Sequence, residues 1–494
     1  MNISDFLLGA GDPTAPALTD AGHTHSYAQL RHAAGVLAAE LAALGLPPGA
    51  RVAVVGANSL FWVAGYLAVM KLNLVAVPIT DKSTPEDVQR NVRLVECSAV
   101  LIDRRLSRRF AGALDGLAVL TDDALGSARE PHWPAASTDV NADAVLMFTS
   151  GTTNVPKAVR ITHANIRANT ESIITYLGLR PSDRVLVILP FYYCYGASLL
   201  HTHLRLGAHV VLCNSFVYPE TAIDLLDTEQ CTVFAGVPSS FQLLLRATTF
   251  TSRPLPSLRI IQQAGGKLPP VMIDELIAAQ PSAEVFVMYG QTEATARLSY
   301  LPPHLLREKR GSVGRGIPGV ELAVLDEEMR AVPPGLRGEI YAVGDNISPG
   351  YFRDPEGSAA KFTSHGLRTG DLAEVDQDGY IFIVDRRDDF IKSWGYRVSS
   401  QEVEAAVLRM EQLVSAAVVG VPDDEAGEAV TLFVTTRPGS DVATEDILAH
   451  CRRELAKHMV PRSVHIIDAM PLNANGKIAK TSLRKHDGSK VLSV

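Results

Sequence analysis

Segments with helical periodicity alternate with short apolar segments through the first three hundred residues, and this alternation constrains the fold most. Ser26 is a suitable N-cap for the first predicted helix. Strands that alternate with helices at this spacing predict crossover connections and largely parallel sheets. The predicted helix and strand pairs are residues 27–44 with 52–55, 85–96 with 99–102, 163–177 with 184–189, 222–229 with 232–235, and 270–279 with 284–288.

The pattern changes near residue 313, where Gly and Pro separate short alternating segments at 321–325, 338–343 and 380–384. Such punctuation predicts antiparallel hairpins. After Asp385 a compact βαββαβ-like order follows, and Ser399 with Glu402 has the spacing of a capping box. The predicted elements there are helix 401–410, strands 415–421 and 430–435, helix 444–457 and strand 463–467.

Composition narrows the classes of function. The 494 residues contain 46 Lys and Arg against 54 Asp and Glu, a net charge of −8, so no basic excess exists to neutralise nucleic acid. The five cysteines never form a C-x-x-C pair, which indicates neither a disulfide framework nor a zinc site and fits a reducing compartment. The most apolar stretch, 60–70, is shorter than the ~20 residues of a membrane span, so we expect a buried core helix. With no secretory signal at the start of the sequence, the expected location is the cytoplasm.

A loop rich in hydroxyl groups and glycine follows the predicted strand 144–148 and reads TSGTTNVPK over residues 149–157. Many donors and one lysine suit the binding of a polyphosphate. A Walker A loop would place Lys before Ser or Thr at the start of a helix. Here Pro156 precedes Lys157, and residues 158–161 alternate like a strand, so a phosphate-binding loop between two strands is predicted.

Four further motifs follow in order: YGQTEA at 289–294, TGD at 369–371, DRRDDFIK at 385–392 with Gly395 and Arg397, and PLNANGK at 471–477. Together with the loop at 149–157, this series resembles the adenylate-forming superfamily, which includes acyl-CoA synthetases, adenylation domains of nonribosomal peptide synthetases and firefly luciferase. The resemblance extends over nearly the whole chain.

The resemblance implies an α/β fold. A large N-terminal domain, residues 1–385, would contain two α/β sheets and a distorted antiparallel β-barrel and would bind ATP and the acid. A small mobile α+β domain, residues 386–494, would carry the catalytic lysine. The charged run 385–389 marks the boundary between them.

The resemblance also implies the nucleotide site. The hydroxyl-rich loop would hold the β- and γ-phosphates, the glycines and Tyr289 would enclose adenine, and Asp371 with Arg386 would hold the ribose. The implied nucleotide-binding residues are Thr149, Ser150, Gly151, Thr152, Thr153, Lys157, Gly265, Gly266, Tyr289, Gly290, Asp371, Arg386 and Arg397.

The implied catalytic residues are Lys477, Thr292, Glu293 and Gly395. Thr292 would contact the α-phosphate, and Glu293, a hard oxygen ligand, would hold Mg²⁺. The Lys477 ammonium would stabilise the charge that develops between the carboxylate and the α-phosphate. In this family the C-terminal domain turns about a hinge, Asp388 here, so that Gly395 replaces the lysine and opens a channel for a thiol.

Tyr193 and Gly236 are the implied acid-binding residues. Relatives that activate α-amino acids carry an Asp near residues 189–196, and this segment has none. A hydrophobic or aromatic acid, bearing one hydroxyl in some cases, is therefore expected over an α-amino acid.

The resulting prediction is ATP-dependent formation of an acyl-adenylate with release of pyrophosphate, followed by transfer to coenzyme A. Transfer to the phosphopantetheine of a separate carrier protein, capture by an amine, and luciferase-like oxidation are the alternatives for the second step. A decayed, nucleotide-binding relative would lack Lys477, Glu293 or Asp371, and all three are present. A serine hydrolase would need a G-x-S-x-G elbow, which the chain lacks, and His201 with His203 face apart on a helix, which disfavours a metal pair.

Overall fold

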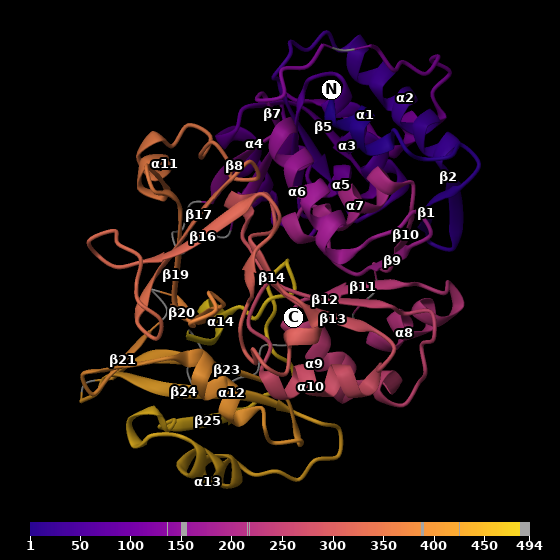
Figure 1. The fold of residues 1–494 in the computed structure, drawn as a ribbon. Coiled ribbons are helices and arrows are strands. Elements are labelled where there is room, and N and C mark those ends of the chain that lie inside the picture. The colour runs from indigo at the N-terminus through magenta and orange to yellow at the C-terminus, as the bar shows by residue number, and fades with distance from the viewer. Residues whose placement is uncertain are drawn as a thin grey trace.

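The computed structural model describes residues 1–135, 137–149, 156–214, 216, 218–386, 390–423 and 425–484. Within these residues the chain forms four sheets, three of them in the N-terminal part and one in the C-terminal part. Figure 1 shows the C-terminal sheet and its helices set apart from the others, in orange and yellow. The predicted α/β class with a separate C-terminal domain is confirmed.

The first sheet has the strand order β6-β5-β3-β4-β7-β8, and its pairs are parallel except β7 with β8. Alternate residues of β3 face opposite sides: Val52 and Val54 pack with helices α2 and α3, whereas Ala53 and Val55 pack with α4. Helices therefore cover both faces. The bounds are β3 Arg51–Val55, β4 Val75–Ile79, β5 Cys97–Ile102, β6 Ala118–Thr121, β7 Asp143–Thr149, β8 Lys157–Thr162, α2 Tyr27–Ala43, α3 Leu60–Lys71 and α4 Pro85–Leu94.

The second sheet has the order β15-β14-β13-β12-β11-β9-β10-β1-β2, with parallel pairing from β1 through β13. Helices α6 and α7 lie on its inner face, and α8, α9 and α10 lie on the outer one. The bounds are β1 Pro16–Asp20, β2 His23–Ser26, β9 Arg184–Val187, β10 His209–Leu212, β11 Val233–Gly236, β12 Ile260–Gln263, β13 Glu284–Tyr289, β14 Ser299–Leu301, β15 Arg315–Gly316, α6 His163–Leu177, α7 Cys194–Leu206, α8 Pro219–Thr228, α9 Pro238–Ala247 and α10 Pro270–Ala279.

Both α/β sheets contribute to one apolar cluster, and α3 lies within it. Residues 61–71 of α3 are all buried, so the core helix predicted for 60–70 is confirmed. None of the helices in the described residues is long and apolar enough to cross a membrane. Two short helices complete this region: α1 (Ile3–Leu8) precedes β1, and α5 (Arg104–Arg109) follows β5.

The third sheet is antiparallel, as predicted from the punctuation after residue 313. Its strands are β16 Val320–Leu325, β17 Arg337–Gly344, β18 Phe362–Thr363, β19 Gly366–Val375 and β20 Ile381–Arg386, and α11 is Pro355–Lys361. The C-terminal sheet pairs β22-β21-β24-β23, with β25 parallel to β24. Its elements are β21 Ile391–Ser393, β22 Tyr396–Val398, α12 Ser400–Val407, β23 Leu413–Asp423, β24 Gly427–Thr436, α13 Thr444–Glu454, β25 Ser463–Ile466 and α14 Lys480–Arg484.

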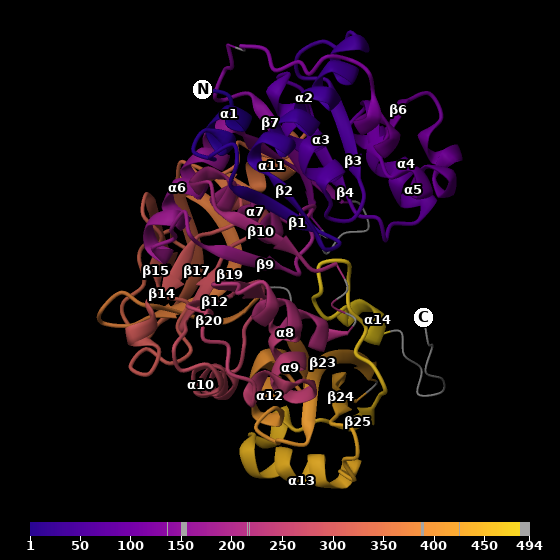
Figure 2. The ribbon, with the colours of Figure 1, turned by 90° about the vertical axis from the view of Figure 1, so that its right-hand side faces the viewer.

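Among the described residues, α9 and a segment near the C-terminus both bring the two domains into contact. Helix α9 packs on β23, and the segment between β25 and α14 leaves the C-terminal sheet and reaches the N-terminal domain. Figure 2 shows this segment in yellow, rising from the C-terminal domain toward the N-terminal one. It contains the predicted catalytic lysine.

Asn58 connects the two α/β sheets at the start of the predicted acid-binding segment, residues 189–196. Its side-chain Nδ2 donates to the Leu189 carbonyl at 2.9 Å, and its Oδ1 accepts from the Phe191 N–H at 2.8 Å. Asn58→Ala should lower the free energy of unfolding by about 2–4 kcal/mol, because two buried backbone groups lose their partners. Urea unfolding followed by tryptophan fluorescence, to which Trp62 packed on Phe191 contributes, measures this change.

The matched control is Asn214→Ala, since Asn214 gives a single hydrogen bond to the Asn58 carbonyl and is exposed. We expect a loss of about 1 kcal/mol or less there. Equal unfolding midpoints for the two variants would show that the side chain of Asn58 is not the main connection between the two α/β sheets.

Candidate functional site

The segment after β13 is held in one conformation by a close backbone approach. A Cβ at Gly290 would lie 1.9 Å from the Ala296 carbonyl oxygen, so only glycine fits. Thr295 has a φ of +63°, and its hydroxyl donates to the Asn346 carbonyl at 2.7 Å. The turn between these points presents Thr292, whose hydroxyl donates to the Cys194 sulfur at 3.5 Å.

Glu293 is buried and oriented by a neutral donor. The Tyr351 hydroxyl donates to its Oε1 at 2.8 Å, and burial, reinforced by Glu293, raises the pKa of Tyr351 and keeps it a donor. Lys157 Nζ lies 4.7 Å from the centroid of the Tyr351 ring and 3.1 Å from an oxygen of Asp354. Lys157 and Glu293, distant in sequence, therefore meet around one tyrosine.

Asp371 receives two donors. The Tyr289 hydroxyl donates to its Oδ2 at 2.5 Å, and Arg386 Nε donates to its Oδ1 at 3.1 Å. Nearby, Lys361 Nζ donates to the Thr369 carbonyl at 2.8 Å, and burial lowers the pKa of Lys361. The ends of β13 and β20 and the middle of β19 thus bring a phenol, a guanidinium and a carboxylate together.

The lysine-bearing turn is anchored by backbone contacts. Asn473 Oδ1 accepts from the Lys477 N–H at 3.0 Å. The Tyr192 hydroxyl donates to the Ala474 carbonyl at 2.7 Å, and the Ser239 hydroxyl donates to the carbonyl of Gly476. These contacts hold the C-terminal turn against the N-terminal domain.

Lys477 itself points at the predicted acid-binding residues. Its Nζ lies 5.5 Å from the centroid of the Tyr193 ring. Burial, and to a smaller extent the charge of Arg386, lowers the pKa of Lys477. An ammonium in this setting interacts strongly with any anion placed beside it, because little water screens it.

Gly265 lies at the centre of this group. Its φ is +89°, and a Cβ there would lie 2.9 Å from Val237 Cγ1, 3.1 Å from the Tyr193 hydroxyl and 3.4 Å from Lys477 Cε. At Gly236 a Cβ would approach the Phe241 ring to 3.1 Å. A side chain at Gly265 would therefore fill the space between Lys477 and Tyr193, whereas one at Gly236 would meet helix α9.

Other predicted residues lie elsewhere. Gly395 and Arg397 are exposed on the hairpin of β21 and β22, away from the Lys477 turn, and a Cβ at Gly395 would meet nothing within 4 Å. Thr149 ends β7, and its hydroxyl donates to the Lys157 carbonyl at 3.5 Å. A Cβ at Gly266 would lie 3.2 Å from the Pro238 ring. Ser150, Gly151, Thr152, Thr153 and Asp388 lie outside the described residues.

The donor set fits a nucleoside triphosphate with a divalent cation. Lys157, Lys361 and Lys477 supply positive charge, and Glu293 and Asp371 supply carboxylates. Among the described residues no group of three or more His, Cys, Asp or Glu could hold a metal by itself. A site with one carboxylate suits Mg²⁺, which keeps water and phosphate oxygens as its other ligands.

Sequence reasoning missed Tyr351 and Lys361, which touch the site through Glu293 and Thr369. Their partners are contributed by other strands, and the only local signal is an aromatic residue after Pro349-Gly350. His201 and His203 are buried, and burial lowers the pKa of each. His201 contacts the Tyr66 hydroxyl and His203 the Leu199 carbonyl, in agreement with a structural role.

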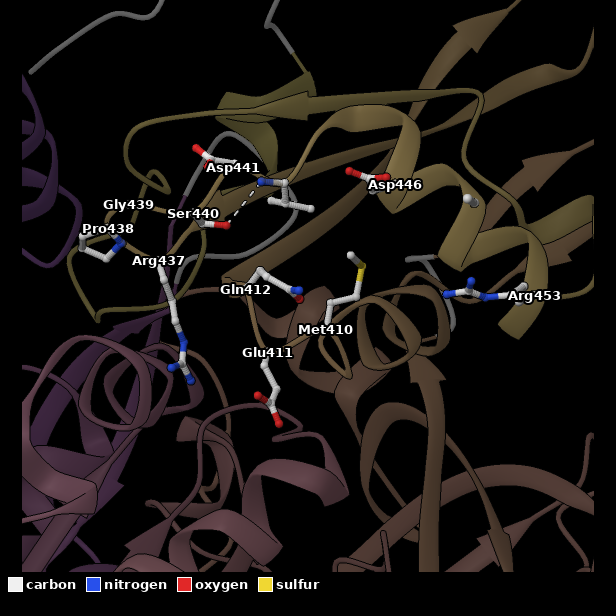
Figure 3. A pocket seen from close by; sticks show the side chains of 12 residues that line it. Met410, Glu411, Gln412, Arg437, Pro438, Gly439, Ser440, Asp441, Asp446 and Arg453 are labelled. Atoms are coloured by element: carbon white, nitrogen blue, oxygen red, sulfur yellow. Dashed lines mark hydrogen bonds between the residues drawn. The ribbon is translucent and has the colours of Figure 1, made fainter.

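A separate groove of about 790 Å³ lies on the C-terminal domain (Figure 3). It is lined by the turn after α12, the loop 437–442 and α13. None of the predicted site residues is among its lining residues, so the site described above is independent of it.

Comparison with known proteins identifies the family. Residues 9–352 match the family model described as AMP-binding enzyme, and residues 402–477 match that of the AMP-binding enzyme C-terminal domain. The chain is 31% identical over 489 residues to a feruloyl-CoA synthase of Amycolatopsis sp. The alignment covers 96% of each protein.

Two solved structures extend the likeness to the whole fold. ATP-bound MatB from Rhodopseudomonas palustris is 29% identical, with a TM-score of 0.87 and coverage of 98% of each chain. o-Succinylbenzoate CoA synthetase from Bacillus subtilis, in complex with its acyl-adenylate intermediate, is 27% identical, with a TM-score of 0.87 and coverage of 99% of each chain. The chain therefore belongs to the AMP-binding enzymes and is an AMP-forming acid–thiol ligase of the adenylate-forming superfamily.

Proposed function

We propose that this protein uses ATP and Mg²⁺ to convert a carboxylic acid into an acyl-adenylate, releases pyrophosphate, and transfers the acyl group to the thiol of coenzyme A. The observation that carries the first step is the position of Lys477 between Tyr193 and Gly265, close to Arg386 and Asp371. Coenzyme A as acceptor is supported by the CoA-ligase names of the relatives.

Bringing a carboxylate to the α-phosphate joins two anions, so the chain must neutralise charge and orient the reactants. Lys477 stabilises the charge on the carboxylate and the α-phosphate oxygen, and Thr292 donates to the same phosphate. Asp371 accepts from the ribose hydroxyls while Tyr289 and Arg386 fix its orientation. Mg²⁺ bound at Glu293 would neutralise the departing pyrophosphate.

We further propose that the domains divide at residues 385 and 386 and that the C-terminal domain turns for the second step. The exposed turn of Trp394 and Gly395, both with positive φ, would then face the acyl-adenylate. A glycine there would let the thiol arm pass close to the backbone. Transfer to a carrier protein or an amine remains an alternative acceptor and is an outcome of the second test below.

Lys477→Ala should abolish carboxylate-dependent exchange of pyrophosphate into ATP, with a loss on the order of 100-fold or more, because a charge that acts in the transition state is removed. Equilibrium binding of ATP should change little. The control is Lys480→Ala, three residues away, whose ammonium pairs with Glu404 at 2.7 Å within the C-terminal domain. Exchange that survives in the Lys477 variant would refute its role.

Gly395→Leu should leave pyrophosphate exchange intact and slow thioester formation with coenzyme A by about 10-fold or more, because a side chain would obstruct the thiol. Gly439→Leu is the matched control, since Gly439 also has open space around it and a φ of +76°, against +78° for Gly395. Both variants therefore carry the same backbone strain.

Equal slowing in the two glycine variants would assign the effect to strain alone. Intact adenylation without any thioester, in the unmodified protein, would indicate a carrier protein or an amine as the acceptor. Assays of both half-reactions on each protein separate these results.

A further inference from the structure

Arg297 is a buried cation that the adenylation step does not use. Its side chain is 1% exposed, its Nε donates to the Tyr176 hydroxyl at 3.1 Å, and its Cζ lies 4.5 Å from the centroid of the Tyr195 ring. Its Nη2 is buried without a hydrogen-bond partner, and no Asp or Glu among the described residues forms an ion pair with it. A buried guanidinium without a carboxylate is costly, which indicates that its anion arrives with a ligand.

Gln262 is a second unpartnered polar side chain beside the same tyrosine. It is fully buried, and neither its Nε2 nor its Oε1 has a hydrogen-bond partner in the described chain. The Tyr195 hydroxyl donates to the Gln262 carbonyl at 2.8 Å. Gln262 of β12 is paired with Ala235 of β11 on one side and with Phe286 of β13 on the other. Both of these neighbours belong to the apolar cluster between the two α/β sheets.

Two tyrosine rings connect the catalytic lysine with Arg297. Lys477 Nζ is 5.5 Å from the centre of the Tyr193 ring, and the Tyr193 and Tyr195 rings are 6.4 Å apart and edge-to-face. Tyr195 in turn contacts the guanidinium of Arg297 and the backbone carbonyl of Gln262. A linear acid whose reacting carboxylate meets Lys477 would extend past Tyr193 toward these groups.

We propose that Arg297 and Gln262 bind a second carboxylate at the far end of the acid, so that the substrate is a dicarboxylic acid. This assignment rests on the proposed adenylation. A guanidinium pairs with a carboxylate through two parallel hydrogen bonds, and the amide of Gln262 adds a further donor. An acid with an apolar end would leave the cation and the amide unpaired, which selects against it.

The test compares straight-chain and aryl dicarboxylic acids with their own monomethyl esters in pyrophosphate exchange. We expect the unmodified protein to prefer at least one diacid over its monoester by about 100-fold or more in kcat/KM. Arg297→Met, of similar length without the charge, should remove most of that preference, and Arg297→Lys should retain part of it. Tyr176→Phe is the control, because it removes the hydrogen bond to Nε and keeps the guanidinium.

The same ratio of diacid to monoester in the unmodified protein and in Arg297→Met would overturn the proposal. Melting curves and ATP binding establish that each variant is folded, and Arg297→Lys carries the comparison if the Met variant is unstable. A preference for monoesters in the unmodified protein would likewise overturn it.

A binding measurement separates this proposal from adenylation itself. Equilibrium dialysis of the diacids, with a non-hydrolysable ATP analogue present, needs no chemical step. Suppose that the unmodified protein binds a diacid, that Arg297→Met does not, and that no acid supports pyrophosphate exchange. This result would support the role of Arg297 and refute the proposed function. Exchange with monocarboxylic acids that Arg297→Met leaves unchanged would refute the diacid and support the proposed function.

Discussion

The two hydrogen bonds that Tyr192 and Ser239 give to backbone carbonyls of the 473–477 turn are the contacts on which the assembled site depends. They join the domains at the point where Lys477 enters. Both acceptors are backbone groups, and the Asn473 side chain closes the turn from within. A hydrogen bond of this kind contributes about 1 kcal/mol, so this part of the contact can break and re-form during turnover.

The carboxylates of the site are oriented by phenols. Tyr351 donates to Glu293 and Tyr289 donates to Asp371, and burial raises the pKa of both tyrosines well above the physiological range. A neutral donor fixes a carboxylate without cancelling its charge. Glu293, with a phenol as its donor, is suited to the proposed divalent cation, whereas Asp371 is also paired with Arg386 and is better suited to hydroxyl groups.

The elements with strong local signals were the ones that could be predicted from the sequence. Helices 163–177 and 270–279 have the predicted bounds, and the first begins at a reciprocal capping box of Thr162 and Asn165 and ends at a left-handed Gly178. The Ser26 cap is also confirmed. Helix α8 was predicted to begin at 222 but begins at Pro219, because proline fits the first turn of a helix.

Strand β23 runs over 413–423, longer than the predicted 415–421, because its pairing with β24 continues to the turn. Helix α13 ends at Glu454 and not at 457, since residues 457–459 form a separate short helical turn. Such ends depend on partners that are distant in sequence. Prediction of the candidate site from the sequence is limited in the same way. The motifs identified Lys477, Glu293 and Asp371, but the environment of Arg297 depends on Tyr176, which is distant in the sequence.

The rigidity of Arg297 decides how selective the acid end can be. A guanidinium on a flexible side chain would escape to water when its ligand is absent, at little cost. Arg297 is held between the Tyr176 hydroxyl and the Tyr195 ring, and its carbonyl accepts from Asn346 Nδ2 at 2.7 Å. The Tyr176 ring is itself stacked on Tyr300 at 4.2 Å. With the cation fixed in place, an acid that cannot pair with it gains nothing from rearrangement, so discrimination against that acid is imposed before the chemical step begins.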